Sequence, residues 1–215
     1  MKTNYQLILD AELQRIVSSG GTPSLLLHSC CGPCSSYVLE YLARYFRITV
    51  LYYNPNIWPE SEFIHRAETQ KQLLSAARYD NLVDIIIPGY APSEFYAVSS
   101  GLEGEPEGGA RCLRCFELRL QETAKRARDG GYDWFSTTLS VSPHKDAEAL
   151  NRIGQQAAER YGVSYLCADF KKRDGYKRSI ELSAQYGLYR QDYCGCEYSV
   201  RSSPSAQARA NDTDN

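Results

Sequence analysis

Short apolar runs alternate along the chain with longer segments of helical periodicity. Each run is too short for a helix, is rich in β-branched or aliphatic residues, and suits a buried strand. The runs cover residues 24–28, 48–53, 83–87, 133–139 and 163–167. Strands that alternate with helices predict an α/β fold, with a mostly parallel sheet, helices on both of its faces and right-handed connections.

The segments between the runs carry apolar residues three to four positions apart, which predicts helices. One helix is marked by Val38, Leu39, Leu42 and Phe46, and the others are expected at residues 1–21, 61–78, 116–128, 146–161 and 179–186. Ser61 is the expected N-cap of its helix. Residues 88–111 have Pro, Gly and little periodicity, so we expect a long loop that delivers a cysteine pair.

The composition fits one folded domain. The 215 residues are 43% hydrophobic and 23% charged, a globular balance that can bury a full core. We expect residues 1–201 to form a single α/β domain and residues 202–215, which are polar, to form a disordered tail. The formal net charge is −2, so a site for a polyanion must be a local patch.

Cysteine usage narrows the chemistry. No apolar leader and no membrane-spanning run is legible, so we expect a cytoplasmic protein with reduced thiols and no membrane partner. Clustered cysteines in that setting indicate metal or redox chemistry rather than structural disulfides. The eight are Cys30, Cys31, Cys34, Cys112, Cys115, Cys167, Cys194 and Cys196.

Three of these cysteines follow the first predicted strand, in the segment His28-Ser29-Cys30-Cys31-Gly32-Pro33-Cys34. Ligands of a parallel sheet bind outside the carboxyl ends of its strands. The chain has neither the G-x-G-x-x-G motif nor the G-x-x-x-x-G-K-[ST] motif that binds phosphate there. Thiols therefore occupy the position of a phosphate-binding loop. The Cys31-Gly32-Pro33-Cys34 stretch also suits a thioredoxin-like redox motif. The third thiol, Cys30, and the later cysteine pairs argue against that interpretation.

Cys30 and Cys31 together with Cys112 and Cys115 offer four thiolates, which suit tetrahedral zinc or an iron–sulfur cluster. Adjacent cysteines fit a cubane, because its irons are separate and each takes one thiolate, whereas we expect them to strain a single zinc site. A zinc knuckle that pins the long loop, and free thiols, stay open as alternatives.

Cys194-Gly195-Cys196 is a second thiol motif. A disulfide across one residue distorts disulfide geometry, and strained disulfides tend to be labile or catalytic. A redox dithiol is therefore the favoured interpretation, and a further pair of metal ligands is the alternative. Cys167 ends an apolar run and is expected to be buried and inert.

The histidines carry weaker signals. His28 and Ser29 end the first strand, so either one faces the site or packs beside it. His65 lies in a predicted helix and is expected to be exposed or capping. His144 follows Pro143 in a loop, where it is either a general acid or an ordinary loop residue.

Basic residues gather in two places, and the chain has 17 tyrosines. Basic groups interleaved with aromatic rings suit unpaired RNA, whose bases stack on such rings. A solvated charged face explains the same pattern equally well. The two groups are Lys171, Lys172, Arg173, Lys177 and Arg178, and Arg111, Arg114 and Arg119.

Five ordered motifs over residues 25–199 resemble those of the QueH-type epoxyqueuosine reductases. They are residues 28–34, Tyr53-Asn54-Pro55-Asn56-Ile57, Arg111-Cys112 with Cys115, residues 137–145, and Tyr193-Cys194-Gly195-Cys196. The resemblance implies a Rossmann-like fold of the adenine-nucleotide hydrolase type, with a cysteine-bearing loop and helical appendage. It implies an oxidoreductase that removes the epoxide oxygen of epoxyqueuosine in tRNA as water, the last step of queuosine synthesis.

The resemblance also implies cofactors and site residues. The family carries a [4Fe–4S] cluster and a redox-active cysteine pair, uses no cobalamin, and is thought to hold an additional iron ion. Carried over, the cluster ligands are Cys30, Cys31, Cys112 and Cys115, and the dithiol is Cys194 with Cys196. Cys34 is the candidate contributor to the additional iron. The electron donor is unidentified, and Asp192, Tyr193 and His144 are candidate proton donors.

Three other functions stay open at this point. A thioredoxin-like thiol–disulfide oxidoreductase would use Cys31 and Cys34 and be colourless. A zinc-stabilised RNA-binding domain would hold zinc and catalyse nothing. A nucleotide-activating tRNA-modifying enzyme would bind ATP, which the missing phosphate loop disfavours.

Overall fold

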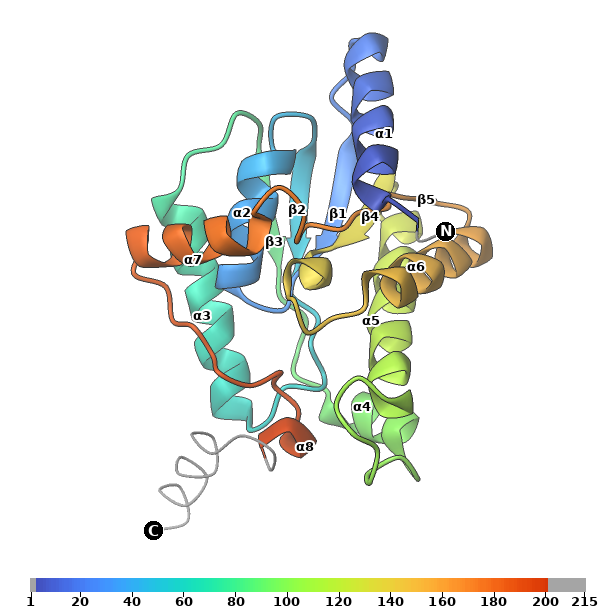
Figure 1. Cartoon of the computed structure of the whole chain (residues 1–215), viewed down its shortest axis with the longest axis vertical. Coiled ribbons are helices and arrows are strands. Elements are labelled where there is room, and N and C mark those ends of the chain that lie inside the picture. The colour runs from blue at the N-terminus through green and yellow to red at the C-terminus, as the bar shows by residue number, and fades with distance from the viewer. Residues whose placement is uncertain (1–2, 201–215) are drawn as a thin grey trace.

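A five-stranded parallel sheet forms the centre of the computed structural model, which describes residues 3–200 (Figure 1). The strand order is β3-β2-β1-β4-β5, the order of a doubly wound Rossmann sheet. The predicted α/β fold is therefore confirmed, while the tail at 202–215 lies outside the described residues and the single-domain division stays a prediction. The strands are β1 (Ser24–His28), β2 (Arg47–Leu51), β3 (Val83–Ile86), β4 (Trp134–Thr137) and β5 (Ser164–Tyr165).

Helices connect the strands, and one of them is capped at both ends. Asp146 accepts hydrogen bonds from the backbone N–H groups of Glu148 and Ala149, and Gly162 ends the same helix at a φ of 67°. The helices are α1 (Tyr5–Ser19), α2 (Gly32–Leu42), α3 (Glu60–Ala76), α4 (Pro92–Ser99), α5 (Ala110–Asp129), α6 (Ala147–Tyr161), α7 (Gly175–Gln185) and α8 (Glu197–Val200), with a 3-10 turn at Thr138–Val141.

The alternation of side chains along β1 explains why both faces of the sheet are covered. Leu25 and Leu27 pack into a cluster with residues of α1, α2 and α3. Leu26 points to the opposite face and packs with residues of α5 and α6. Figure 1 shows α2 and α3 on one side of the strands and α5 and α6 on the other. Burial on both faces accounts for the nearly continuous apolar sequence of this strand.

Several local predictions are wrong. Phe46 lies outside the helix that it was expected to mark, because α2 ends at Leu42, and α7 begins at Gly175 rather than at residue 179. Residues 88–111 are not one long loop, because α4 lies within them and α5 begins at Ala110. The eight residues of α4 start at Pro92 and bury Phe95, so the helix is too short to leave a periodic pattern. The N-cap of α3 is Pro59 rather than Ser61, since the helix begins at Glu60.

Candidate functional site

The site lies at the carboxyl end of β1, where the strand order reverses. β1 pairs with β2 on one side and with β4 on the other. The chain continues from β2 into α3 on one face of the sheet and from β4 into α6 on the opposite face. In doubly wound sheets this switch point opens a crevice that binds ligands. Cys30, Pro33 and Cys34 of the following segment line this crevice.

Three thiols converge there. The ligand sulfurs of Cys30, Cys31 and Cys34 all lie within 4.8 Å of one another, and the Cys30 and Cys31 sulfurs are 3.7 Å apart. Cys34 lies in the first turn of α2, which begins at Gly32. A Cβ on Gly32 would lie 3.0 Å from the Thr69 carbonyl oxygen, so the glycine lets the cysteine loop sit close against α3.

Buried polar groups hold this loop in place. The Oγ atoms of Ser29 and Ser35 lie 2.7 Å and 2.8 Å from Oε1 of Gln70 on α3 and donate hydrogen bonds to it. Asn54 donates from Nδ2 to the Ser29 carbonyl oxygen at 2.8 Å. These hydrogen bonds fix the backbone that carries the thiols.

His28 does not face the crevice. Its ring is fully buried between Oγ1 of Thr137 at 2.9 Å and the carbonyl oxygen of Tyr53 at 3.1 Å. Burial, assisted by the charge of Arg119, lowers the pKa of His28 to about 3, so the ring is neutral. His28 therefore clamps β1 to its neighbours. His65 is exposed, as expected, and its ring meets that of Tyr189 edge-on.

The three thiols perturb one another's charge through hydrogen bonds. Hydrogen bonding to Cys30 and Cys34 lowers the pKa of Cys31, while the hydrogen bond with Cys31 raises the pKa of Cys30 to about 11. Hydrogen bonds with the same two neighbours raise the pKa of Cys34. Without a bound cation, the three cysteines therefore hold negative charge mainly on the Cys31 sulfur. A thiophilic metal ion would favour the deprotonated form of all three.

The donor set fits a metal. Metal–sulfur bonds of about 2.3 Å in a tetrahedron separate the sulfurs by about 3.8 Å. The 3.7 Å between the sulfurs of the adjacent pair Cys30 and Cys31 matches that edge. The two sulfurs are therefore close enough to bind one metal ion, and the strain expected of neighbouring cysteines at a single zinc site stays a prediction. Cys34 completes this tight group.

Cys112 and Cys115 flank the group from the start of α5 rather than from a loop. The backbone N–H of Gly108 donates to the Cys112 sulfur at 3.3 Å, and Cys30 packs against the apolar cluster that contains Cys112. Cys115 shares a second cluster with Phe95 and Cys196, and burial raises the pKa of its thiol to about 12. The four-ligand set with Cys30 and Cys31 stays a prediction.

Cys194-Gly195-Cys196 reaches the same region from the C-terminal segment. Gly195 has a φ of 122°, in a region that only glycine adopts freely, and its carbonyl oxygen accepts a hydrogen bond from Trp58 N–H at 2.8 Å. Both cysteines are free thiols. Cys194 is half-buried, whereas Cys196 is buried.

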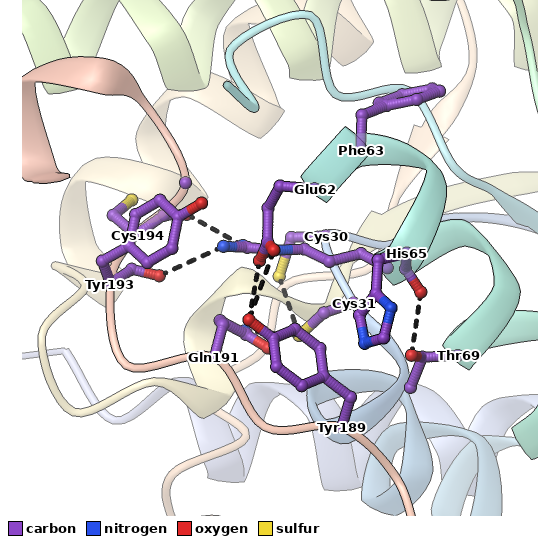
Figure 2. Close-up of polar contacts among 12 residues, drawn as sticks. Cys30, Cys31, Glu62, Phe63, His65, Thr69, Tyr189, Gln191, Tyr193 and Cys194 are labelled. Carbon is purple, nitrogen blue, oxygen red and sulfur yellow. Dashed lines mark hydrogen bonds and ion pairs between the residues drawn. The ribbon is translucent and has the colours of Figure 1, made fainter. Parts of the chain in front are cut away.

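Arg66 of α3 anchors this segment. Its guanidinium donates to the carbonyl oxygens of Cys194 at 3.3 Å and Tyr193 at 3.5 Å, and it pairs with Glu62 at 2.7 Å. Figure 2 shows the segment from Tyr189 to Cys194 passing close to Glu62 and the thiol pair. Gln191 of the same segment donates from Nε2 to the Cys31 sulfur at 3.0 Å.

Arg119 of α5 is a buried cation among the thiols. Its Nη1 and Nε atoms donate to Oδ1 of Asn54 and the carbonyl oxygen of Cys115, both at 3.4 Å, and its Nη2 has no hydrogen-bond partner within residues 3–200. Burial opposes its charge, but Cys115, Cys194, Cys30 and Cys112 outweigh that penalty and raise its pKa. A cation in this position favours an anionic group, such as a thiolate-bound metal centre.

The thiol-bearing segments line one crevice of about 730 Å³, large enough for a nucleoside-sized ligand. Its walls include Cys30, Cys34, Arg119, Lys145 and Cys194, together with Tyr176, Arg190, Asp192, Tyr193 and His144. Lys145, Gln191 and Arg66 were given no role from sequence. Of the three, Lys145 lies where the sequence could have indicated a site residue, because it follows β4 at the carboxyl edge of the sheet.

The two expected basic groups are mostly committed to other contacts. Arg111 is buried and donates to the carbonyl oxygens of Leu102, Glu103 and Glu105, and Arg119 is buried in the site. In the other group, Arg173 pairs with Asp10, Arg178 with Glu40 and Lys171 with Asp169. Backbone carbonyl oxygens or a neighbouring carboxylate therefore compensate the charge of these residues. Lys172 and Lys177 are exposed.

Fold and site together define a Rossmann-like α/β protein whose nucleotide-binding position is filled by thiols. The profile of the family described as epoxyqueuosine reductase QueH matches residues 25–202. The chain belongs to this QueH family.

Similar proteins support that assignment. The chain is 41% identical over 202 residues to the epoxyqueuosine reductase QueH of Streptococcus pyogenes serotype M1, covering 93% of this chain and 79% of the relative. It is 43% identical over 205 residues to QueH of Staphylococcus epidermidis, covering 93% and 85%. QueH of Thermotoga maritima is 34% identical over 183 residues, covering 82% and 90%. Within residues 3–200, no helix combines the length and apolarity needed to cross a membrane.

Proposed function

We propose that the protein reduces epoxyqueuosine in tRNA to queuosine. The observation that carries this proposal is the convergence of thiols from the segment after β1 and from the C-terminal segment on one crevice, with the α5 thiols packed beside them, in a chain of the QueH family. Loss of the epoxide oxygen as water consumes two electrons and two protons and leaves a double bond. Oxidation of one dithiol to a disulfide releases two electrons and two protons, so the Cys194 and Cys196 thiols balance the reaction.

The proposed metal centre uses Cys30, Cys31, Cys112 and Cys115 as ligands of a [4Fe–4S] cluster, with Cys34 contributing to an additional iron ion. When bound, such a centre supplies electron transfer and Lewis acidity. Support for a metal comes from the tight sulfur group around Cys30 and from the unpartnered Nη2 atom of Arg119, whose charge suits an anionic centre. No cobalamin is part of this proposal.

The protein's own residues bind and orient the substrate in this scheme. The crevice accommodates one extruded nucleoside, with the rings of Tyr176 and Tyr193 available for stacking and Arg190 at its wall for a phosphate. Asp192, Tyr193 and His144 also line the crevice, and one of them would hold the proton for the leaving oxygen. The proposed setting is the cytoplasm, with an electron donor that regenerates the dithiol.

The test compares two serine variants of buried cysteines. Cys112→Ser removes a proposed ligand, whereas Cys167→Ser changes a thiol outside the site, where burial raises the pKa to about 11. We expect anaerobically purified Cys112→Ser to lose most of its iron, acid-labile sulfide and reduction of epoxyqueuosine in tRNA. Cys167→Ser should keep all three.

The outcomes separate the alternatives. A Cys112→Ser variant with full iron, sulfide and activity contradicts the ligand assignment. Zinc without iron in the unmodified protein favours the RNA-binding domain, and a metal-free protein that reduces disulfides favours the oxidoreductase that uses Cys31 and Cys34. Iron and sulfide without any reduction of the tRNA nucleoside contradict the proposed substrate.

A further inference from the structure

Lys145 is a buried ammonium at the junction of the crevice and the C-terminal segment. Its side chain is 8% exposed, and Nζ lies 2.9 Å from the sulfur of Cys194 and 3.2 Å from Oε1 of Glu107. The loop that carries it is fixed, because its backbone N–H donates to the carbonyl oxygen of Ser142 and its carbonyl oxygen accepts from Lys171 Nζ. The ammonium is therefore held beside the sulfur.

A buried ammonium requires negative partners, because desolvation penalises an isolated charge. Burial lowers the pKa of Lys145, but the Cys194 sulfur and the Glu107 carboxylate outweigh this and raise it, so the side chain stays charged. The side chain of Glu107 is 40% exposed, and water screens much of its charge. The sulfur is consequently the partner on the inner side of the ammonium.

The two thiols of the Cys194-Gly195-Cys196 motif have different surroundings. Cys194 lines the crevice and accepts the hydrogen bond from Lys145. Cys196 is 6% exposed and packs with Phe95 and Cys115, away from the crevice. Only the first sulfur combines access to the crevice with a hydrogen bond from a neighbouring cation.

We propose that Lys145 is a positioning residue that makes Cys194 the first of the two sulfurs to react with an electrophile, and that Cys196 is the second thiol. The assignment deepens the proposed function, since it rests on the dithiol role given to this pair. In the alkylation used below, the Cys194 thiolate forms a carbon–sulfur bond with iodoacetamide and iodide leaves with the electron pair.

The test follows alkylation of the full-length, anaerobically reduced protein at neutral pH by mass spectrometry. Trypsin releases residues 191–201 as one peptide, and fragmentation separates Cys194 from Cys196. We expect Cys194 to react first, and Lys145→Met to slow it about tenfold through loss of one charge-assisted hydrogen bond. Lys145→Arg should restore most of the rate, and Glu107→Gln should not reduce it.

The assignment is wrong if Cys196 reacts first, if Lys145→Met leaves the Cys194 rate unchanged, or if Lys145→Arg does not restore that rate. A fourth contradicting result is an equal loss of rate in Glu107→Gln, because that loss would indicate a structural disturbance. Circular dichroism of each variant checks that it is folded, and the Arg variant keeps the test valid if the Met variant is not. Because alkylation needs no tRNA, the order of reaction can hold while nucleoside reduction fails, and the reverse.

Discussion

Arg66→Met tests whether one buried guanidinium holds the dithiol segment against α3. The Arg66 side chain is 1% exposed, pairs with Glu62, donates to the carbonyl oxygens of Tyr193 and Cys194, and lies 4.9 Å from the centre of the Tyr193 ring. Methionine keeps much of the apolar stem but removes every one of the polar contacts. The variant therefore isolates the anchoring role of the charge.

The expected cost follows from the partners that Arg66 leaves behind. Removing one member of a buried ion pair costs about 3–5 kcal/mol. Glu62 also accepts hydrogen bonds from the hydroxyl of Tyr189, so its carboxylate stays partly compensated. We therefore expect a loss near the lower end, about 3 kcal/mol in the free energy of unfolding, or about 6–12 °C in Tm for a protein of this size.

Urea unfolding followed by circular dichroism measures this loss, with all proteins prepared to the same iron content. Hydrogen exchange should also speed up in residues 189–200. Arg15→Met is the matched control, because the Arg15 side chain is 75% exposed in its pair with Glu12 and should contribute less than about 0.5 kcal/mol. A loss below about 1 kcal/mol in Arg66→Met, with unchanged exchange, would refute the anchoring argument.

Two further predictions concern the clamp and the turn. The pKa of His28 is about 3 in the folded protein and 6.5 in the unfolded chain, so below pH 6.5 the unfolded chain binds one more proton. The free energy of unfolding should therefore fall as pH drops from about 6.5 towards 3, by up to about 1.4 kcal/mol per pH unit. Urea midpoints at pH 7, 5 and 4 should depend less on pH in His28→Gln, and equal slopes in the two proteins would contradict this prediction. Gly195→Ala should cost about 2 kcal/mol, because φ is 122° and its Cβ would lie 3.0 Å from Nη1 of Arg66, whereas Gly104→Ala, with open space, should cost little in the same assay.

Sequence periodicity was sufficient for the sheet and its direction. Apolar runs of five to seven residues located all five strands, and their alternation with helices required parallel pairing. The prediction that Cys30 and Cys31 lie outside the end of β1 also holds, because the carboxyl edge of a parallel sheet follows from strand direction alone. The short α4 was missed, since eight residues around Pro92 give no repeat to recognise.

Tertiary structure decided which side chains meet. Cys34 joins Cys30 and Cys31 because α2 starts at Gly32 and turns its third residue toward them, and the Lys145 ammonium reaches a sulfur 49 positions away in the chain. Arg119, counted with the basic residues from its sequence neighbourhood, is buried among thiols instead. Sequence spacing fixes distances within one element, whereas distances between elements depend on how the helices are rotated and packed on the sheet, and that packing is a property of the whole core.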